Sequence, residues 1–211
     1  MTKTYLFEEN INPKDISFEL ILKLDAEDSL ADQKEKFDLP EGLIYLDGNS
    51  LGAMPKEVST YFEKELREGW ATGLIRSWNQ KGWHVMPVTL GNRLAPMMGA
   101  DEGEVLIVDS TSLNLFKTLV AALKMRPDRS EVVSEKGNFP SDIHVVQGVL
   151  NNFFPNSKLI LTGNTDDEII SAINEKTAVV TLTHVNYKTG QIHDMKRITE
   201  KAHENGALII W

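Results

Sequence analysis

The sequence predicts an α/β protein with a mainly parallel sheet and flanking helices. From residue 104 onward, short apolar runs alternate with longer amphipathic segments. The apolar runs are rich in Val, Ile and Leu, as strands buried on both faces are. Strands that alternate with helices in this way are typical of parallel sheets with right-handed crossovers.

The first part of the chain is predicted to be mostly helical. Apolar residues at helical spacing indicate a helix over residues 16–24. Asp25 is predicted to interrupt this helix and to cap a second one, which ends before Pro40. Residues 43–47 then predict a short strand, and the Gly- and Asn-rich residues 48–52 predict a turn.

Two further helices are expected before the alternating region begins. Pro55 suits the first position of a helix that Gly69 ends. Residues 70–83 are rich in Gly and Trp and are predicted to be irregular. Apolar residues at helical spacing predict the second helix over residues 88–97.

The alternating region predicts five strands joined by four helices. The predicted strands are residues 105–108, 131–134, 158–161, 178–182 and 207–211. The predicted helices are residues 113–123, 142–150, 165–175 and 195–204. Thr165 and Glu168 form a capping box at the start of the third helix, and Gly206 ends the fourth.

Composition excludes several classes of protein. With 31 acidic and 22 basic residues the formal charge is −9, which argues against nucleic-acid partners and anionic membranes. The absence of cysteine excludes disulfides, thiolate metal sites and a cysteine nucleophile. The first ten residues lack the pattern of a signal peptide and no apolar run suits a membrane helix, so we expect a cytoplasmic protein.

The loop at residues 137–142 is the first candidate binding element. It follows a predicted strand, and ligands of open α/β sheets bind beyond the carboxyl ends of strands. Phe139 offers a stacking surface, Pro140 stiffens the loop, and Ser141 and Asp142 offer hydrogen-bonding groups. These residues indicate half of a site for a flat polar cofactor. The alternative is a proline-containing turn in which Asp142 caps the next helix.

A second candidate, residues 109–112, precedes a predicted helix. The free N–H groups of a helix N-terminus and the hydroxyls of Thr111 and Ser112 suit a phosphate group. Neither GxxxxGK[ST] nor GxGxxG is present, so no motif supports nucleotide binding. The alternative is that Ser110 or Thr111 only caps the helix.

The third candidate, residues 181–190, is polar for a short connection after a strand. We interpret His184 as a hydrogen-bonded structural residue. No second histidine stands at ligand spacing, and His193 lies far along the loop, so a metal site is not expected. All three candidates follow strands of one sheet and are therefore predicted to share a rim. No GxSxG elbow is present, which disfavours a serine hydrolase.

Four motifs in order resemble the kynureninase family, particularly its bacterial type. They are residues 46–52, 74–79, 138–142 and 183–190. The resemblance covers about residue 25 to Trp211. It implies a fold-type I enzyme dependent on pyridoxal phosphate (PLP), which cleaves the Cβ–Cγ bond of kynurenine with water to give anthranilate and alanine in tryptophan catabolism. PLP acts as the electron sink in that chemistry.

The resemblance also implies roles for individual residues. The implied cofactor-binding residues are Thr111, Ser112, Phe139, Pro140, Ser141, Asp142 and Thr183. Thr111 and Ser112 would hold the phosphate, and Phe139 would stack on the pyridine ring. Ser50 and Trp78 would face the substrate of a homodimer.

The resemblance ends before the groups that complete the family's site. In that family the acidic partner of the pyridine nitrogen, the lysine that binds PLP covalently and a small C-terminal domain follow the strand that matches residues 207–211. We therefore expect an inactive fragment without catalytic residues. Residues 1–100 would form a helical arm and substrate-side segment, and residues 101–211 the first part of the PLP-binding domain. Alternatives are another fold-type I enzyme, such as a cysteine desulfurase or aminotransferase, or a non-catalytic truncated domain.

Overall fold

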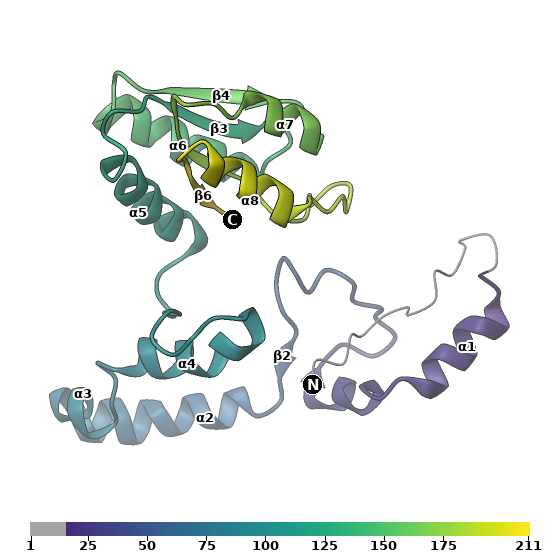
Figure 1. Ribbon diagram of the computed structural model, residues 1–211. Helices are drawn as coiled ribbons and strands as arrows, with labels where there is room; N and C mark the ends of the chain where they lie inside the picture. Colours follow the sequence, from purple (N-terminus) through teal and green to yellow (C-terminus); the bar gives the residue numbers. More distant parts are fainter. Residues whose placement is uncertain (1–15) are drawn as a thin grey trace. The chain divides into compact units, whose positions relative to one another are not determined.

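Figure 1 shows the computed structural model, which describes residues 16–211. The described chain divides into two compact units between Met86 and Pro87. The first ten residues, for which the sequence predicts no leader, lie outside the described part. The assignment of residues 1–100 and 101–211 to functional parts stays a prediction.

The first unit is largely helical, with one small sheet. Its helices are α1 (Phe18–Glu27), η2 (Ala31–Lys36), α2 (Val58–Lys64), η3 (Glu65–Gly73), η4 (Leu74–Arg76) and α3 (Ser77–Gln80). Its sheet pairs β1 (Phe37–Asp38) antiparallel with β2 (Met54–Pro55). The helical character that the sequence predicts for this part is confirmed, but several boundaries differ.

The first boundary that differs is at Asp25, which lies within α1 and does not cap a second helix. The cap of α1 is Ser17, whose hydroxyl accepts a hydrogen bond from the Leu20 N–H at 3.1 Å. An aspartate in a helix costs less than about 1 kcal/mol, so a well-capped helix continues through it. The next helix, η2, is a short 3₁₀ segment that follows Leu30 without a side-chain cap.

The predicted strand at residues 43–47 is wrong, because this segment is irregular and has no pairing partner within the described chain. Pro55 lies in β2, so the following helix begins at Val58. A proline can take an edge-strand position as readily as the first turn of a helix, and here pairing with β1 decides between them.

The prediction of irregular structure over residues 70–83 is also wrong for most of that segment. The chain does not end its helix at Gly69 but continues through the π-helix η3 into η4 and α3. The buried hydroxyl of Ser77 donates to the Gly69 carbonyl at 2.7 Å. A Cβ atom at Gly73 would collide with this hydroxyl, so the glycine permits the close approach.

The second unit contains the parallel sheet. Its strands are β3 (Glu131–Glu135), β4 (Lys158–Thr162), β5 (Thr177–Thr181) and β6 (Leu208–Ile210), in the order β4-β3-β5-β6. Its helices are α5 (Thr111–Lys124), α6 (Pro140–Phe153), α7 (Asp166–Ala172) and α8 (Met195–Glu204), while α4 (Met86–Met98) begins at the boundary. None of the helices in residues 16–211 combines the length and apolarity needed to span a membrane.

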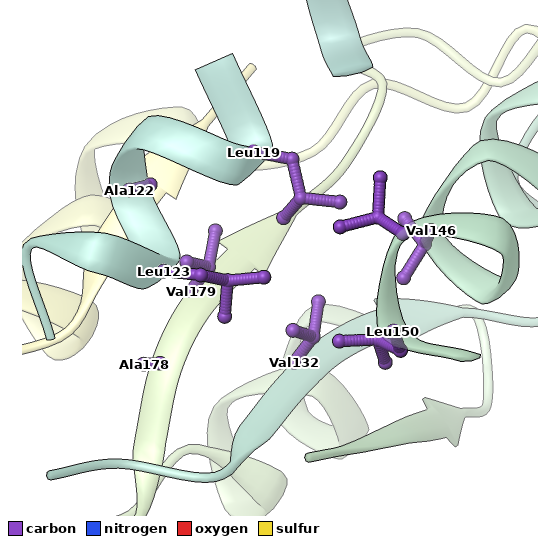
Figure 2. Close-up of a cluster of buried hydrophobic side chains, with 9 residues drawn as sticks. Leu119, Ala122, Leu123, Val132, Val146, Leu150, Ala178 and Val179 are labelled. Carbon is purple, nitrogen blue, oxygen red and sulfur yellow. The ribbon is translucent and has the colours of Figure 1, made fainter. Parts of the chain in front are cut away.

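Helices cover both faces of this sheet. Val132 and Val179 point to one face, where they pack with residues of α5 and α6, as Figure 2 shows. Their neighbours Val133 and Val180 point to the other face and pack with residues of α7 and α8. Because successive side chains in a strand alternate between faces, β3 and β5 each contribute one of these valines to each core.

The predicted strand at residues 105–108 does not form. Leu106, Ile107 and Val108 are exposed, and no strand of the described chain pairs with them. The segment instead contacts α4. The N–H of Ile107 donates to the Pro87 carbonyl at 3.1 Å, and Gly91 lies so close to the Val105 carbonyl that a Cβ atom would not fit. The sheet therefore has four strands in place of the predicted five.

We expect Leu119→Ala to lower the free energy of unfolding by about 2–5 kcal/mol, because the substitution leaves a cavity in the core between α5, α6 and the sheet. Leu119 is 0% exposed, whereas Leu113 on the same helix is 49% exposed. Leu113→Ala is the matched control and should cost less than about 1 kcal/mol. Urea unfolding of both variants measures the difference, and equal losses would contradict this core.

Candidate functional site

The carboxyl ends of β3 and β5 are joined directly at the rim of the sheet. The hydroxyl of Ser134 donates to the Thr181 carbonyl at 2.7 Å. The same hydroxyl accepts a hydrogen bond from the Asn138 side chain at 3.1 Å. These buried bonds fix the start of the loop after β3 relative to β5.

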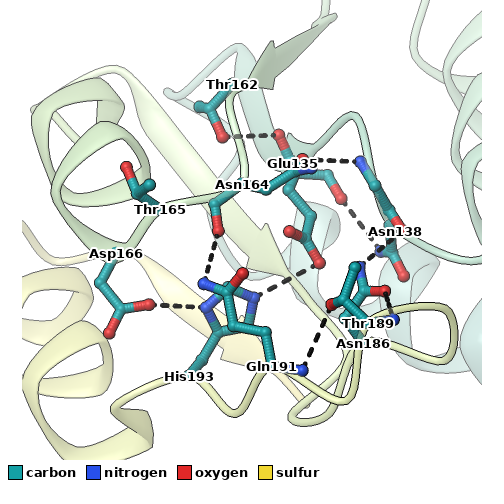
Figure 3. Close-up of polar contacts among 12 residues, drawn as sticks. Glu135, Asn138, Thr162, Asn164, Thr165, Asp166, Asn186, Thr189, Gln191 and His193 are labelled. Atoms are coloured by element: carbon teal, nitrogen blue, oxygen red, sulfur yellow. Dashed lines mark hydrogen bonds and ion pairs between the residues drawn. The ribbon is translucent and has the colours of Figure 1, made fainter.

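Two asparagines hold the backbone of Gly137 within this loop. Its N–H donates to the Asn164 side chain at 3.0 Å, and its carbonyl accepts from the Asn186 side chain at 3.2 Å. The buried Asn186 also accepts hydrogen bonds from the backbone N–H groups of Lys188 and Thr189. Figure 3 shows the side chains of Asn164 and Asn186 on either side of this polar network. The loops after β3, β4 and β5 are therefore linked.

Phe139 stands where the loop becomes α6. It takes the N-cap position with an extended backbone, and Pro140 follows as the first helical residue. The Phe139 ring is 45% exposed and meets the Tyr187 ring edge to face, with centroids 4.9 Å apart. The first and third candidates, which are predicted to share a rim, are thus in contact, and a partly exposed aromatic residue lies there.

Ser141 and Asp142 follow in the first turn of α6. The Ser141 hydroxyl donates to Oδ1 of Asp142 at 3.3 Å. Burial raises the pKa of Asp142 above its ordinary value, and the bond from Ser141 offsets part of this shift. Asp142 does not cap α6, because the N-cap is Phe139 without a side-chain cap bond. The interpretation of Asp142 as the cap is therefore wrong, although a proline-containing turn does open α6.

The second candidate lies at the start of α5. Ser110 caps this helix by accepting a hydrogen bond from the Leu113 N–H at 3.4 Å, which confirms the capping interpretation for this residue. Thr111 and Ser112 occupy the first helical turn, whose N–H groups lack intrahelical acceptors. Within the described residues, no hydrogen bond or ring contact joins Thr111 or Ser112 to the other two candidates.

The remaining predicted residues are dispersed. Thr183 is half-buried and follows the end of β5 by two residues. Ser50 and Trp78 belong to the first unit, where the Ser50 hydroxyl donates to Asp47 and the exposed Trp78 ring stacks with His84. Their predicted role toward a substrate stays a prediction.

The structure corrects the roles of two histidines. Among the residues that the structure describes, none forms a hydrogen bond with the exposed side chain of His184, whose ring meets Trp211 edge to face with centroids 6.0 Å apart. His193, considered in the sequence only as a metal ligand, is buried between Asp166 and Glu135. The sequence carries little signal for this cluster, because Glu135 and Asp166 belong to two other elements and lie far from His193 along the chain. Across residues 16–211, no cluster of side chains is suited to hold a metal ion.

Comparisons with known proteins agree with this architecture. Residues 44–211 match the family described as aminotransferase class-V. Kynureninase from Pseudomonas fluorescens is 49% identical over 194 residues, and kynureninase from Burkholderia pseudomallei (strain K96243) is 45% identical over the same length. These alignments cover 90% of this chain but 46% of each relative. The chain thus spans about half the length of these curated proteins.

Solved structures resemble the fold at low sequence identity. A C-DES mutant with glycine covalently linked to its PLP cofactor has a TM-score of 0.68 at 17% identity, covering 84% of this chain and 48% of that protein. A cysteine desulfurase from Thermococcus onnurineus NA1 has a TM-score of 0.62 at 20% identity, covering 84% of this chain and 46% of that one. At these identities the likeness supports the fold alone. It confirms the predicted α/β class.

We expect Asn186→Ala to lower the free energy of unfolding by about 1–3 kcal/mol, because the Gly137 carbonyl and two backbone N–H groups lose their partner. The control is Thr189→Ala. That hydroxyl is exposed and accepts a single bond from the Gln191 N–H, so the loss should stay below about 0.5 kcal/mol. Urea unfolding measures both, and an Asn186 variant as stable as the control would refute the linkage of the loops.

Asp166 should make stability depend on pH. Burial raises the pKa of Asp166, but its bond with His193, the Asp194 N–H and nearby positive charges outweigh burial and leave the pKa below 3.8. A lowered pKa stabilises the fold fully above 3.8, and this stabilisation is lost as the pH falls through the folded-state pKa. Asp166→Asn should therefore cost about 1–2 kcal/mol at pH 7, with the difference from the natural chain shrinking below pH 3.8.

The control for this pH dependence is Asp167→Asn. Its carboxylate pairs with Arg197 at 2.6 Å, but the side chain is largely exposed, so its loss should cost less than about 0.5 kcal/mol. Urea unfolding from pH 3 to 7 compares the two variants. A constant difference between Asp166→Asn and the natural chain over that range would show that Asp166 does not contribute in this way.

Proposed function

The chain belongs to the aminotransferase class-V family, and on this premise we propose that it is part of a kynureninase. The observation that carries the proposal is 45–49% identity to kynureninases over 90% of the chain. The proposed reaction is PLP-dependent hydrolysis of the Cβ–Cγ bond of L-kynurenine, or of 3-hydroxykynurenine, to anthranilate and L-alanine. This reaction belongs to tryptophan catabolism.

The loop after β3 fits the pyridine ring of PLP. Phe139 keeps 45% of its surface exposed although its backbone is fixed on both sides, so one aromatic face remains for stacking. Pro140 fixes the turn, and Ser141 and Asp142 would hydrogen-bond with the polar groups of the cofactor. The raised pKa of Asp142 favours a carboxyl that shares a proton with such a group.

The start of α5 fits the phosphate of PLP. Thr111 and Ser112 offer two hydroxyls and two backbone N–H groups in the first turn of a 14-residue helix. The helix dipole adds positive potential at this end. Ser110 already supplies the cap, so the hydroxyls of Thr111 and Ser112 are not needed for that purpose. Thr183, two residues beyond β5, would complete the cofactor contacts of this chain.

PLP, when bound, supplies the electron sink for carbon–carbon cleavage. The residues of this chain orient the cofactor and exclude water from one face of its ring. Ser50 and Trp78 would contact the kynurenine side of the site, in a homodimer of the complete enzyme in the cytoplasm. Both residues are exposed within the first unit, which supports this proposal.

Two alternatives to the kynureninase proposal exist. One is a different enzyme of the same fold, such as a cysteine desulfurase or an aminotransferase, and the other is a domain without catalytic activity. Solved desulfurase-like structures share 17–20% identity with this chain, against 45–49% for kynureninases. The higher identity to kynureninases therefore favours kynurenine as the substrate. Anthranilate fluorescence after addition of L-kynurenine to the complete protein tests the proposal, and alanine release from cysteine without anthranilate would refute it.

In the complete protein, Phe139→Ala should weaken PLP binding about tenfold, because the ring loses its stacking partner. Phe153→Ala is the control, since Phe153 is an exposed aromatic residue at the other end of α6 and should leave the affinity unchanged. Quenching of protein fluorescence on titration with PLP measures both dissociation constants. Equal affinities would refute the stacking role. The 211-residue chain by itself is expected not to turn over kynurenine, since its relatives are about twice as long.

A further inference from the structure

A chain of three ionisable side chains joins three elements of the second unit, as Figure 3 shows. Glu135 ends β3, Asp166 opens α7, and His193 ends a hairpin formed by residues 184–193. Nδ1 of His193 lies 2.6 Å from Oδ1 of Asp166, and Nε2 lies 3.4 Å from Oε1 of Glu135. The contacts proposed for PLP use none of these side chains.

The Glu135 carboxylate is the unusual member of this cluster. Its side chain is 0% exposed, and neither oxygen has a hydrogen bond within the described chain. Nε2 of His193 is also buried without a hydrogen bond, although it lies within ion-pair distance of Glu135. Among the ion pairs of residues 16–211, Glu135 has His193 as its single partner. A buried carboxylate without a compensating charge is strongly unfavourable.

The charge of His193 decides whether this arrangement is stable. A neutral ring that donates from Nδ1 to Asp166 would point the lone pair of Nε2 at the Glu135 carboxylate, which is repulsive. An imidazolium carries a proton on both nitrogens and satisfies both carboxylates at once. No group of side chains in the described chain suits a metal ion that could supply the charge instead.

The cluster sits where the loops of the candidate site are anchored. Glu135 immediately precedes the loop that carries Phe139. The hairpin that ends at His193 carries Tyr187, whose ring meets that of Phe139. Its closing bond runs from the His193 N–H to the His184 carbonyl at 3.0 Å. A shift of His193 would therefore move Tyr187 relative to Phe139.

We propose that His193 is a positioning residue, held as an imidazolium between Glu135 and Asp166, which fixes the 184–193 hairpin against the loop that carries Phe139. This inference rests on the proposed function, since the loop it fixes is the one assigned to the cofactor ring. The imidazolium acts through Phe139 and Tyr187 and does not itself touch the reacting atoms.

Other charged groups surround the cluster. On α7, Asp167 pairs with Arg197 of α8 at 2.6 Å. At the start of α8, the Asp194 N–H donates to Oδ2 of Asp166 at 3.0 Å. The exposed Lys136 follows Glu135 on the other side. Arg197 and the Asp194 N–H stabilise the charge of Asp166, whereas the buried Glu135 has only His193 as an ion-pair partner within residues 16–211.

The charge of His193 can be read by ¹⁵N NMR of the imidazole rings in the 211-residue chain. The sequence contains five histidines, and His193→Asn assigns the relevant ring by the signal that disappears. At pH 7 both ring nitrogens of His193 should carry a proton. A neutral ring with one protonated nitrogen would overturn the proposal, whatever the complete enzyme does with kynurenine.

Glu135→Gln tests the positioning role, because the amide has the size of the carboxylate without its charge. We expect the ring to become neutral, with its proton on Nδ1, and the nuclear Overhauser effect between the Phe139 and Tyr187 rings to fall at least about twofold. Glu131→Gln is the matched control at the opposite end of β3, where the carboxylate contacts Asn174 and Lys158. It should change neither signal.

The outcomes separate this inference from the proposed function. An unchanged charge and ring contact in Glu135→Gln would overturn the positioning role even if the complete enzyme releases anthranilate. Failure to release anthranilate, with the expected NMR result, would refute the kynureninase proposal and leave the charged cluster established. If Glu135→Gln does not fold, the charge of His193 in the natural chain decides.

Discussion

The alternation of side chains along β3 and β5 is the constraint on which the rest of the second unit depends. Val132 and Val179 face one pair of helices, while Val133 and Val180 face the other. A shift of one residue would exchange the two faces, so the helices on both sides fix the register. All four strands run parallel, which brings their carboxyl ends, and the loops that follow, to one edge.

The parts of the fold that are repetitive could be predicted from the sequence. Buried strands with helices between them carry a strong periodic signal, and the capping box of Thr165 and Glu168 marks the start of α7 as expected. The failures at residues 43–47 and 105–108 have a common cause. An apolar run is compatible with a strand, but a strand also requires a partner, and pairing is a long-range property that composition does not carry.

The candidate site likewise contains some residues that the sequence suggests and others that only the folded structure reveals. Phe139, Ser141 and Asp142 could be proposed as candidates because their chemistry is concentrated in one short loop. His193 could not, since its partners Glu135 and Asp166 lie 58 and 27 residues earlier and become neighbours only through folding. Asn164 and Asn186, which bond to the backbone of Gly137, could not be predicted for the same reason. Short sequence motifs thus point to candidate ligand-binding groups more readily than to the groups that hold a loop in place.

The position of β3 inside the sheet has a consequence for synthesis on the ribosome. β3 is made first, yet it lies between β4 and β5, and β5 is separated from it by α6, β4 and α7. At a translation rate of about 5–20 residues per second, β5 is synthesised a few seconds after β3, so β3 lacks one of its two pairing partners for that time. During that interval the nascent chain exposes a backbone edge of a strand that is fully buried after folding. Chaperones that protect apolar strand edges would act on this protein at that stage of translation.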